Sequence, residues 1–103
     1  MGITEITTNN FDESVKDGVS IVDFWAPWCA PCNMLTPIMK DIAENATNFK
    51  VFKVNVDNEQ ELANKFNIMS IPCIKIMKNG EAVEEIIGLT TKENIIEIIN
   101  KFI

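Results

Sequence analysis

Apolar positions along the chain follow two different spacings, one typical of strands and one typical of helices. Residues 19–26 are almost continuously apolar, which predicts a strand covered by protein on both faces. Residues 33–46 carry apolar side chains at helical intervals and predict an amphipathic helix. The same spacings predict further strands at residues 3–6, 50–56, 71–77 and 81–87, and further helices at 11–16, 57–66 and 90–103. The side chains expected to face a core include Met34, Leu35, Ile38, Met39, Ile42 and Ala43 of the second helix, and Ile95, Ile96, Ile98, Ile99, Phe102 and Ile103 of the last.

The order of these elements is strand, helix, strand, helix, strand, helix, strand, strand, helix. This order predicts an α/β fold in which helices flank a central mixed sheet, with the parallel strands first and a hairpin at one edge. Asn79-Gly80, between the last two strands, is a strong signal for a two-residue hairpin turn. Because the chain has 103 residues, we expect one domain spanning residues 1–103.

Charge and composition narrow the class of partner. Nine basic and fifteen acidic residues leave a net charge of -6, which argues against nucleic acid or an anionic membrane surface as a partner. The apolar runs are shorter than the ~20 residues of a membrane span, and the first residues do not have the pattern of a secretory leader. Three cysteines, an odd number, fit a reducing compartment. We therefore expect a cytoplasmic protein.

Two cysteines, Cys29 and Cys32, lie where the apolar strand gives way to the helix. The unpaired N–H groups and the dipole at a helix N-terminus stabilise a thiolate, so we expect them to lower the pKa of Cys29. Cys32 follows three residues later on the same helix face and can close a disulfide with Cys29. Pro31 suits the first turn of a helix, where its missing N–H costs no intrahelical hydrogen bond. This placement favours a redox-active pair.

Two other interpretations of the Cys-x-x-Cys motif are weaker. A structural zinc ion usually needs four Cys or His ligands, and the chain has three cysteines and no histidine. A purely structural disulfide is the second alternative, but a chain of this size with 47% hydrophobic residues does not need one to fold. We expect neither a metal nor a cofactor.

Asp23 interrupts the apolar strand that precedes the cysteines. An ionised carboxylate in a buried strand is costly unless it is paired or protonated. One interpretation is an inert, hydrogen-bonded aspartate near the exposed end of the strand. The interpretation we favour is a carboxyl with a raised pKa beneath the thiols, which exchanges a proton with Cys32. Lys53, in the next predicted strand, either faces solvent or lies near Asp23 and moderates the pKa of that carboxyl.

Several short motifs are spread over nearly the whole chain. They are Val22-Asp23-Phe24-Trp25-Ala26, Trp28-Cys29-Ala30-Pro31-Cys32, Pro37, Asn55-Val56-Asp57, Ile71-Pro72, Asn79-Gly80 and Gly88. In these residues the chain resembles the thioredoxin family. The resemblance implies the thioredoxin fold and a thiol–disulfide oxidoreductase that reduces target proteins and acts as an electron carrier.

The resemblance also implies a role for each site residue. It implies that Cys29 attacks a target disulfide, that Cys32 resolves the mixed disulfide, and that Asp23 is the buried proton acceptor with Lys53 as its neighbour. It implies disulfide-containing targets and a thioredoxin reductase, linked to NADPH or to ferredoxin, as partners of a monomer. The residues it assigns to an apolar docking surface are Trp28, Ile71, Pro72 after a cis peptide bond, Gly88 and Leu89.

Three residues depart from the family pattern. Ala30 stands where Gly is common, and Asn33 where a basic residue often follows the second cysteine; both changes bear on the reactivity of Cys29. Cys73 follows Pro72 where Thr is common. It is either a small buried hydrophobe or a thiol that traps Cys29 or Cys32 in an alternative disulfide.

Two other function classes share the fold and motif. One is an oxidase or isomerase of the protein-folding type, against which Pro31 counts by family likeness and the expected compartment counts by its reducing conditions. The other is a non-catalytic module that holds partners through its apolar face. The reduction potential separates the first from a reductase, and the effect of Cys29→Ser separates the second.

Overall fold

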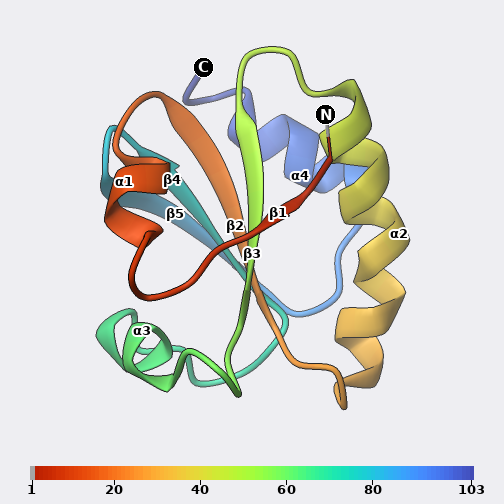
Figure 1. Cartoon of the computed structure of the whole chain (residues 1–103). Helices are drawn as coiled ribbons and strands as arrows, with labels where there is room; N and C mark the ends of the chain where they lie inside the picture. Colours follow the sequence, from red (N-terminus) through yellow and green to blue (C-terminus); the bar gives the residue numbers. More distant parts are fainter. Residues whose placement is uncertain (1) are drawn as a thin grey trace.

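The chain folds around a five-stranded mixed sheet. A computed structural model describes residues 2–103 (Figure 1). The sheet has the strand order β1-β3-β2-β4-β5, in which β1, β3 and β2 run parallel and β4 and β5 are antiparallel to their neighbours. The strands are β1 (Thr4–Glu5), β2 (Val19–Trp25), β3 (Lys50–Asn55), β4 (Cys73–Lys78) and β5 (Glu81–Ile87), and the helices are α1 (Phe11–Val15), α2 (Ala30–Asn45), α3 (Gln60–Lys65) and α4 (Lys92–Ile99). The α/β fold expected from the sequence is confirmed.

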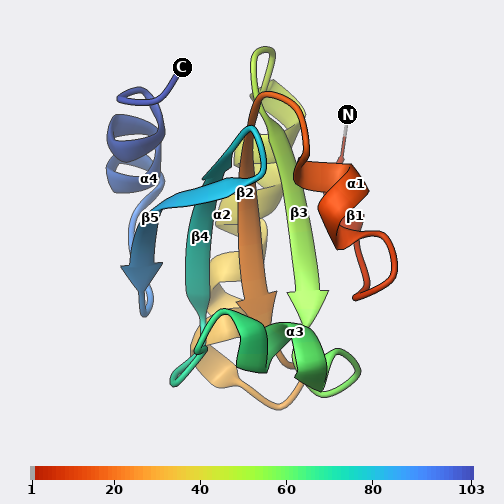
Figure 2. The same cartoon turned by 90° about the vertical axis from the view of Figure 1, so that its left-hand side faces the viewer.

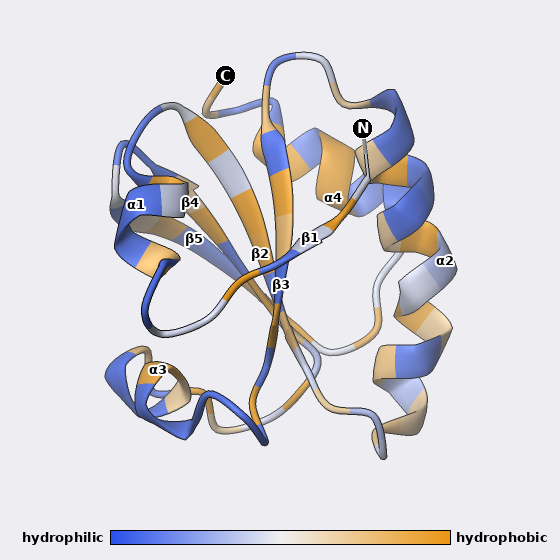
Figure 3. Cartoon of the chain, in the orientation of Figure 1, coloured by the Kyte–Doolittle hydropathy of each residue, from blue (hydrophilic) through white to orange (hydrophobic). Residues whose placement is uncertain are grey.

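Helices cover both faces of the sheet and make two apolar cores. Figures 1 and 2 show α2 and α4 on one face and α1 and α3 on the other. Ile21 of β2 packs with Leu35 and Ile42 of α2 on the first face, whereas Phe24 of β2 packs with Phe11 of α1 on the second. Because β2 lies between β3 and β4 and is covered twice, nearly all its side chains are buried, and Figure 3 shows its apolar character.

A two-residue turn, Asn79-Gly80, joins β4 to β5. Asn79 (φ 50°) and Gly80 (φ 88°) are both in the left-handed region, as a two-residue hairpin turn of the primed type requires. The Asn79 side chain also accepts a hydrogen bond from the Gly18 N–H at 2.8 Å. This second contact ties the hairpin to the start of β2.

Several expected boundaries and burials differ from the structure. The helix expected at 57–66 is the shorter α3, because the N–H groups of Asn58 and Glu59 turn back to the carbonyl of Asn55. The strand expected at 71–77 begins at Cys73, since Pro72 has no N–H for a ladder. Two of the residues expected to face the core do not: Met34 of α2 is 61% exposed, and Ile103, the last residue of the chain, is 48% exposed.

Met34 is exposed because it lies at the margin of the apolar stripe of α2. Its neighbours Cys32 and Leu35 are 1% and 0% exposed, so the inward face of these turns is covered. Met34 borders Leu89, in the segment that joins β5 to α4. Helical periodicity marks the apolar stripe but not where its covered part ends. Figure 2 shows the N-terminus of α2 near the tip of β2, at one end of the molecule.

Candidate active site

Cys29 and Cys32 form a disulfide at the N-terminus of α2. Cys29 is the N-cap residue, with an extended backbone (φ -90°, ψ 110°), and its Cα lies 5.2 Å from that of Cys32. The Cys32 N–H donates to the Sγ of Cys29 at 3.2 Å, and the Asn33 N–H donates to the Cys29 carbonyl at 3.1 Å. Ala30 and Pro31 supply the first helical positions, where Pro is tolerated. One sulfur therefore takes the place of a helix-capping oxygen.

Trp28, the residue before Cys29, is hydrogen-bonded to a residue that is distant in the sequence. Both cysteines are buried, whereas Trp28 is 69% exposed. The Trp28 Nε1–H donates to the Oδ2 of Asp57 at 2.9 Å. Asp57 follows β3 as Trp28 follows β2, and these parallel strands end at the same edge of the sheet. Sequence reasoning gave Asp57 no part in the site, although its position after a strand was the available signal.

The segment before β4, which contains Ile71 and Pro72, contacts the disulfide through Cys29. The Ile71–Pro72 peptide bond is cis, and the carbonyl oxygen of Ile71 lies 3.8 Å from the Sγ of Cys29. The Pro72 carbonyl accepts a hydrogen bond from the Gly88 N–H at 2.8 Å, and Gly88 has a positive φ of 89°. Gly is favoured there because L side chains rarely adopt that backbone conformation. Ile71 thus lies next to Cys29, Gly88 is joined to Ile71 through Pro72, and Leu89 follows Gly88.

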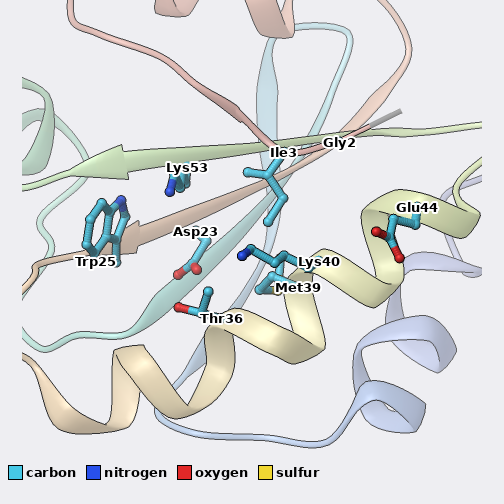
Figure 4. Close-up of a pocket in the computed structure, with 9 residues that line it drawn as sticks. All are labelled: Gly2, Ile3, Asp23, Trp25, Thr36, Met39, Lys40, Glu44 and Lys53. Atoms are coloured by element: carbon cyan, nitrogen blue, oxygen red, sulfur yellow. The ribbon is translucent and has the colours of Figure 1, made fainter.

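Asp23 lines a cavity beside the part of α2 that runs from Thr36 to Glu44. The cavity has a volume of about 350 Å³ and is lined by Asp23, Trp25, Thr36, Lys40 and Lys53 among others. Figure 4 shows the Asp23 carboxyl pointing toward Thr36, with Lys53 on the other side. The Thr36 hydroxyl donates to the Cys32 carbonyl at 3.1 Å, which connects the cavity to the disulfide turn. Thr36 was missed from the sequence, although it lies one helical turn after Cys32.

Burial decides the protonation of Asp23. The residue is 6% exposed, and within residues 2–103 its Oδ1 has no hydrogen-bond partner. Burial raises the pKa of Asp23 from its usual 3.8 to about 7, and the positive charge of Lys53 partly offsets this rise. Asp23 and Lys53 are register partners on adjacent strands, and the Lys53 ammonium lies 4.8 Å from the centre of the Trp25 ring. The chain therefore buries a carboxyl with a pKa near neutral pH in a cavity that it shares with Thr36, the residue hydrogen-bonded to the Cys32 carbonyl.

Cys73 lies apart from the other two cysteines. It is 2% exposed and belongs to the apolar cluster of Phe24, whereas Cys29 and Cys32 belong to a separate cluster. Its Sγ lies 3.8 Å from the Oε1 of Glu85. Burial, helped by this carboxylate, raises the pKa of the Cys73 thiol to about 11. A thiol in this environment is a poor nucleophile near neutral pH.

Comparison with known proteins decides the family. The family model described as Thioredoxin matches residues 2–101. Thioredoxins of Staphylococcus saprophyticus and Bacillus subtilis are each 40% identical to the chain over 102 residues, covering 98% of the chain and 98% of the relative. The chain belongs to the thioredoxin family. A solved structure of a mutant thioredoxin from Halobacterium salinarum matches with a TM-score of 0.91 and 30% identity, covering 98% of this chain and 90% of that one.

Membership of the thioredoxin family establishes the general activity. The chain is a thiol–disulfide oxidoreductase with a Cys29–Cys32 redox pair, and its partners are disulfide-containing substrates and a reductase. The expected family and function are confirmed. Within residues 2–103, no helix has the length and apolar character needed to cross a membrane.

Proposed function

We propose that Cys29 is the attacking sulfur and Cys32 the resolving sulfur of a protein-disulfide reductase. The observation that carries this assignment is the hydrogen bond from the Cys32 N–H to the Sγ of Cys29 at 3.2 Å, at the N-terminus of α2. After reduction, this N–H and the helix dipole stabilise a thiolate on Cys29 more than on Cys32. The first turn of α2 consists of uncharged residues, so no carboxylate side chain in it opposes the thiolate.

The reaction proceeds in two exchanges. The Cys29 thiolate attacks one sulfur of the target disulfide, which forms a mixed disulfide and releases the second target sulfur as a thiolate that takes a proton. Cys32 loses its proton and attacks the Sγ of Cys29, which forms the Cys29–Cys32 disulfide and releases the first target sulfur. The target gains two electrons and two protons, and the reductase later returns two electrons to the pair.

Asp23 is the proton acceptor for Cys32, and Lys53 adjusts its affinity for that proton. A base is most effective when its pKa lies near the working pH, and the pKa of Asp23 is about 7. The Asp23 cavity extends to Thr36, which is hydrogen-bonded to the Cys32 carbonyl. Lys53 lies on the adjacent strand and favours the ionised carboxylate, which is the form of Asp23 that can accept the proton of Cys32.

Target proteins dock on the apolar surface around Cys29. Trp28 and Leu89 are large and exposed, the Ile71 carbonyl lies 3.8 Å from the Sγ of Cys29, and Gly88 is hydrogen-bonded to the Pro72 carbonyl. Exposed apolar side chains grouped around a reactive atom mark a contact surface.

The remaining assignments concern the setting of the reaction. We propose a single-domain monomer that works in the cytoplasm and is reduced by an NADPH-linked or ferredoxin-linked thioredoxin reductase. The buried free thiol of Cys73 supports a reducing compartment, because free cysteines persist there.

Trapping of mixed disulfides tests the roles of the two sulfurs. Reduced Cys32→Ser is expected to accumulate a covalent complex with a disulfide-containing protein such as insulin, because Cys29 attacks and nothing resolves the complex. Reduced Cys29→Ser is expected to form none, and Cys73→Ser, the same change at the third cysteine, is expected to turn over normally. Covalent complexes with Cys29→Ser but not with Cys32→Ser would reverse the assignment.

A further inference from the structure

An apolar groove lies between α2 and the segment that joins β5 to α4. It has a volume of about 500 Å³, within the ~300–1,000 Å³ typical of ligand pockets. Met34 and Ile38 line it from α2, and Leu89 and Thr91 line it from the joining segment, which Figure 1 shows passing along α2. Met34 is 61% exposed and Leu89 is 45% exposed. Two large exposed apolar side chains in one groove favour an interaction site over a chance feature of the surface.

The groove is continuous with the surface around Cys29. The carbonyls of Ile71 and Pro72 link the Cys29 sulfur to Gly88, and Leu89 is the next residue. On α2, Met34 lies one turn beyond Ala30 and therefore on the same helix face. A polypeptide that presents a disulfide to Cys29 thus lies beside the mouth of the groove.

A second apolar groove flanks the site near α3, on the opposite face of the sheet. Trp28, Met69 and Ile71 line it, so a target that crosses the disulfide lies between two grooves. An extended chain directs successive side chains to opposite sides. Residues next to the target cysteine therefore point to one face of the target chain and those two positions away to the other, so the position that enters a groove has to be found by experiment.

The lining of the groove between α2 and α4 offers apolar contacts and disfavours an acidic occupant. Among the described residues that line it, the charged ones are Lys92 and Glu93. The Lys92 Nζ lies 2.8 Å from the Oδ2 of Asp41, so its charge is already paired. The exposed methionine in the lining adapts to side chains of different shape. Among the described residues, seven line the groove, far fewer than the roughly 20–30 residues per partner of a stable interface.

We propose that this groove binds an apolar side chain close to the reactive cysteine of the target polypeptide, and so selects among protein disulfides. The proposal rests on the proposed attack by Cys29, because the groove is placed relative to that sulfur. Targets with a Leu- or Met-sized residue at the matching position react faster than targets with a small polar residue there.

Matched peptides test this selection. Each peptide carries one cysteine in a mixed disulfide with a chromophoric aromatic thiol, and a Leu or a Ser stands at each position within two residues of the cysteine in turn. The rate of thiol release by the reduced protein is measured for each peptide. At one of the positions we expect the wild-type protein to prefer Leu over Ser by roughly tenfold, the effect of burying most of one Leu side chain.

Variants of Met34 show whether the preference comes from this groove. Met34→Gln has nearly the same shape with a polar end, and we expect it to lower the Leu-to-Ser ratio at that position at least threefold. Met34→Leu is expected to keep the ratio. Val83→Thr changes an exposed apolar residue of β5 outside the groove lining and is expected to leave both rates unchanged.

The outcomes separate this proposal from the proposed function. A wild-type protein without a Leu preference, or an unchanged preference in Met34→Gln, would show that the groove does not bind targets. A change in sedimentation behaviour of Met34→Gln with the preference intact would assign the groove to self-association and overturn the proposal. Failure of the wild-type protein to release thiol from any peptide contradicts the attack by Cys29 itself.

Discussion

Replacing Asp23 by Asn is expected to stabilise the protein at neutral pH and to do so less at acidic pH. The carboxyl is buried, and its pKa rises from 3.8 in the unfolded chain to about 7 in the fold. Between these values the folded state binds more protons than the unfolded state, so stability falls as the pH rises. The loss is complete above about pH 7, where it amounts to about 4 kcal/mol for a shift of about three pKa units.

Urea unfolding of the oxidised wild-type protein and Asp23→Asn measures this effect. Asn removes the charge and keeps the shape, so any fixed cost of burying its amide is the same at each pH. The stability difference between the two proteins is expected to grow in favour of Asn by about 3 kcal/mol between about pH 4.5 and pH 8. The control, Asp17→Asn, changes an exposed aspartate and is expected to show no such growth. Parallel stability curves for the wild type and Asp23→Asn would refute the raised pKa.

Three further predictions concern neighbouring groups. Lys53→Met removes a charge that lowers the pKa of Asp23, so the pH at which stability is lost is expected to move upward in the same unfolding series, and an unchanged midpoint would contradict this. Asp57→Ala removes the acceptor of the Trp28 indole N–H, so we expect faster hydrogen exchange of that proton by NMR. The free energy of unfolding is expected to change by less than about 1 kcal/mol, because the pair is exposed. An unchanged exchange rate would show that the hydrogen bond is not maintained in solution. Cys73 is expected to resist alkylation at about pH 8 until the protein unfolds, since it is buried and has a pKa of about 11. Peptide mass mapping after oxidation is expected to find Cys73 as a free thiol. A disulfide between Cys73 and Cys29 or Cys32 would support the alternative interpretation of this cysteine.

The parts of the fold that sequence patterns predicted are those fixed by local chemistry. Residues 19–26 form a doubly covered strand because almost every position is apolar, and Asn79-Gly80 turns because both residues accept a positive φ. Asp23 could be recognised from the same apolar pattern, because a single carboxylate in an otherwise apolar strand needs an explanation. The pKa of Asp23 is raised, as the favoured interpretation requires, while the proton exchange with Cys32 stays a prediction.

The parts that patterns did not predict depend on where distant segments meet. Periodicity placed Met34 on the core-facing side of its helix, but which part of that side is covered depends on segments distant in the sequence. The contact of Trp28 with Asp57 joins residues 29 positions apart, and only the parallel pairing of β2 with β3 brings them together. Both grooves beside the disulfide arise from such meetings. The family resemblance assigned Leu89 to a contact surface, whereas no local pattern marked Met34 as a contact residue.

Asp23 links the stability of the fold to its chemistry. A neutral or apolar residue at this position would be more stable at neutral pH, so packing alone does not account for a carboxyl there. The same burial that costs stability brings the pKa to about 7, where the group both accepts and releases a proton in the working range. Asp23→Asn should therefore combine greater stability at pH 8 with slower resolution of the mixed disulfide by Cys32. A variant that gains the stability and resolves at the wild-type rate would leave the buried charge without a catalytic reason.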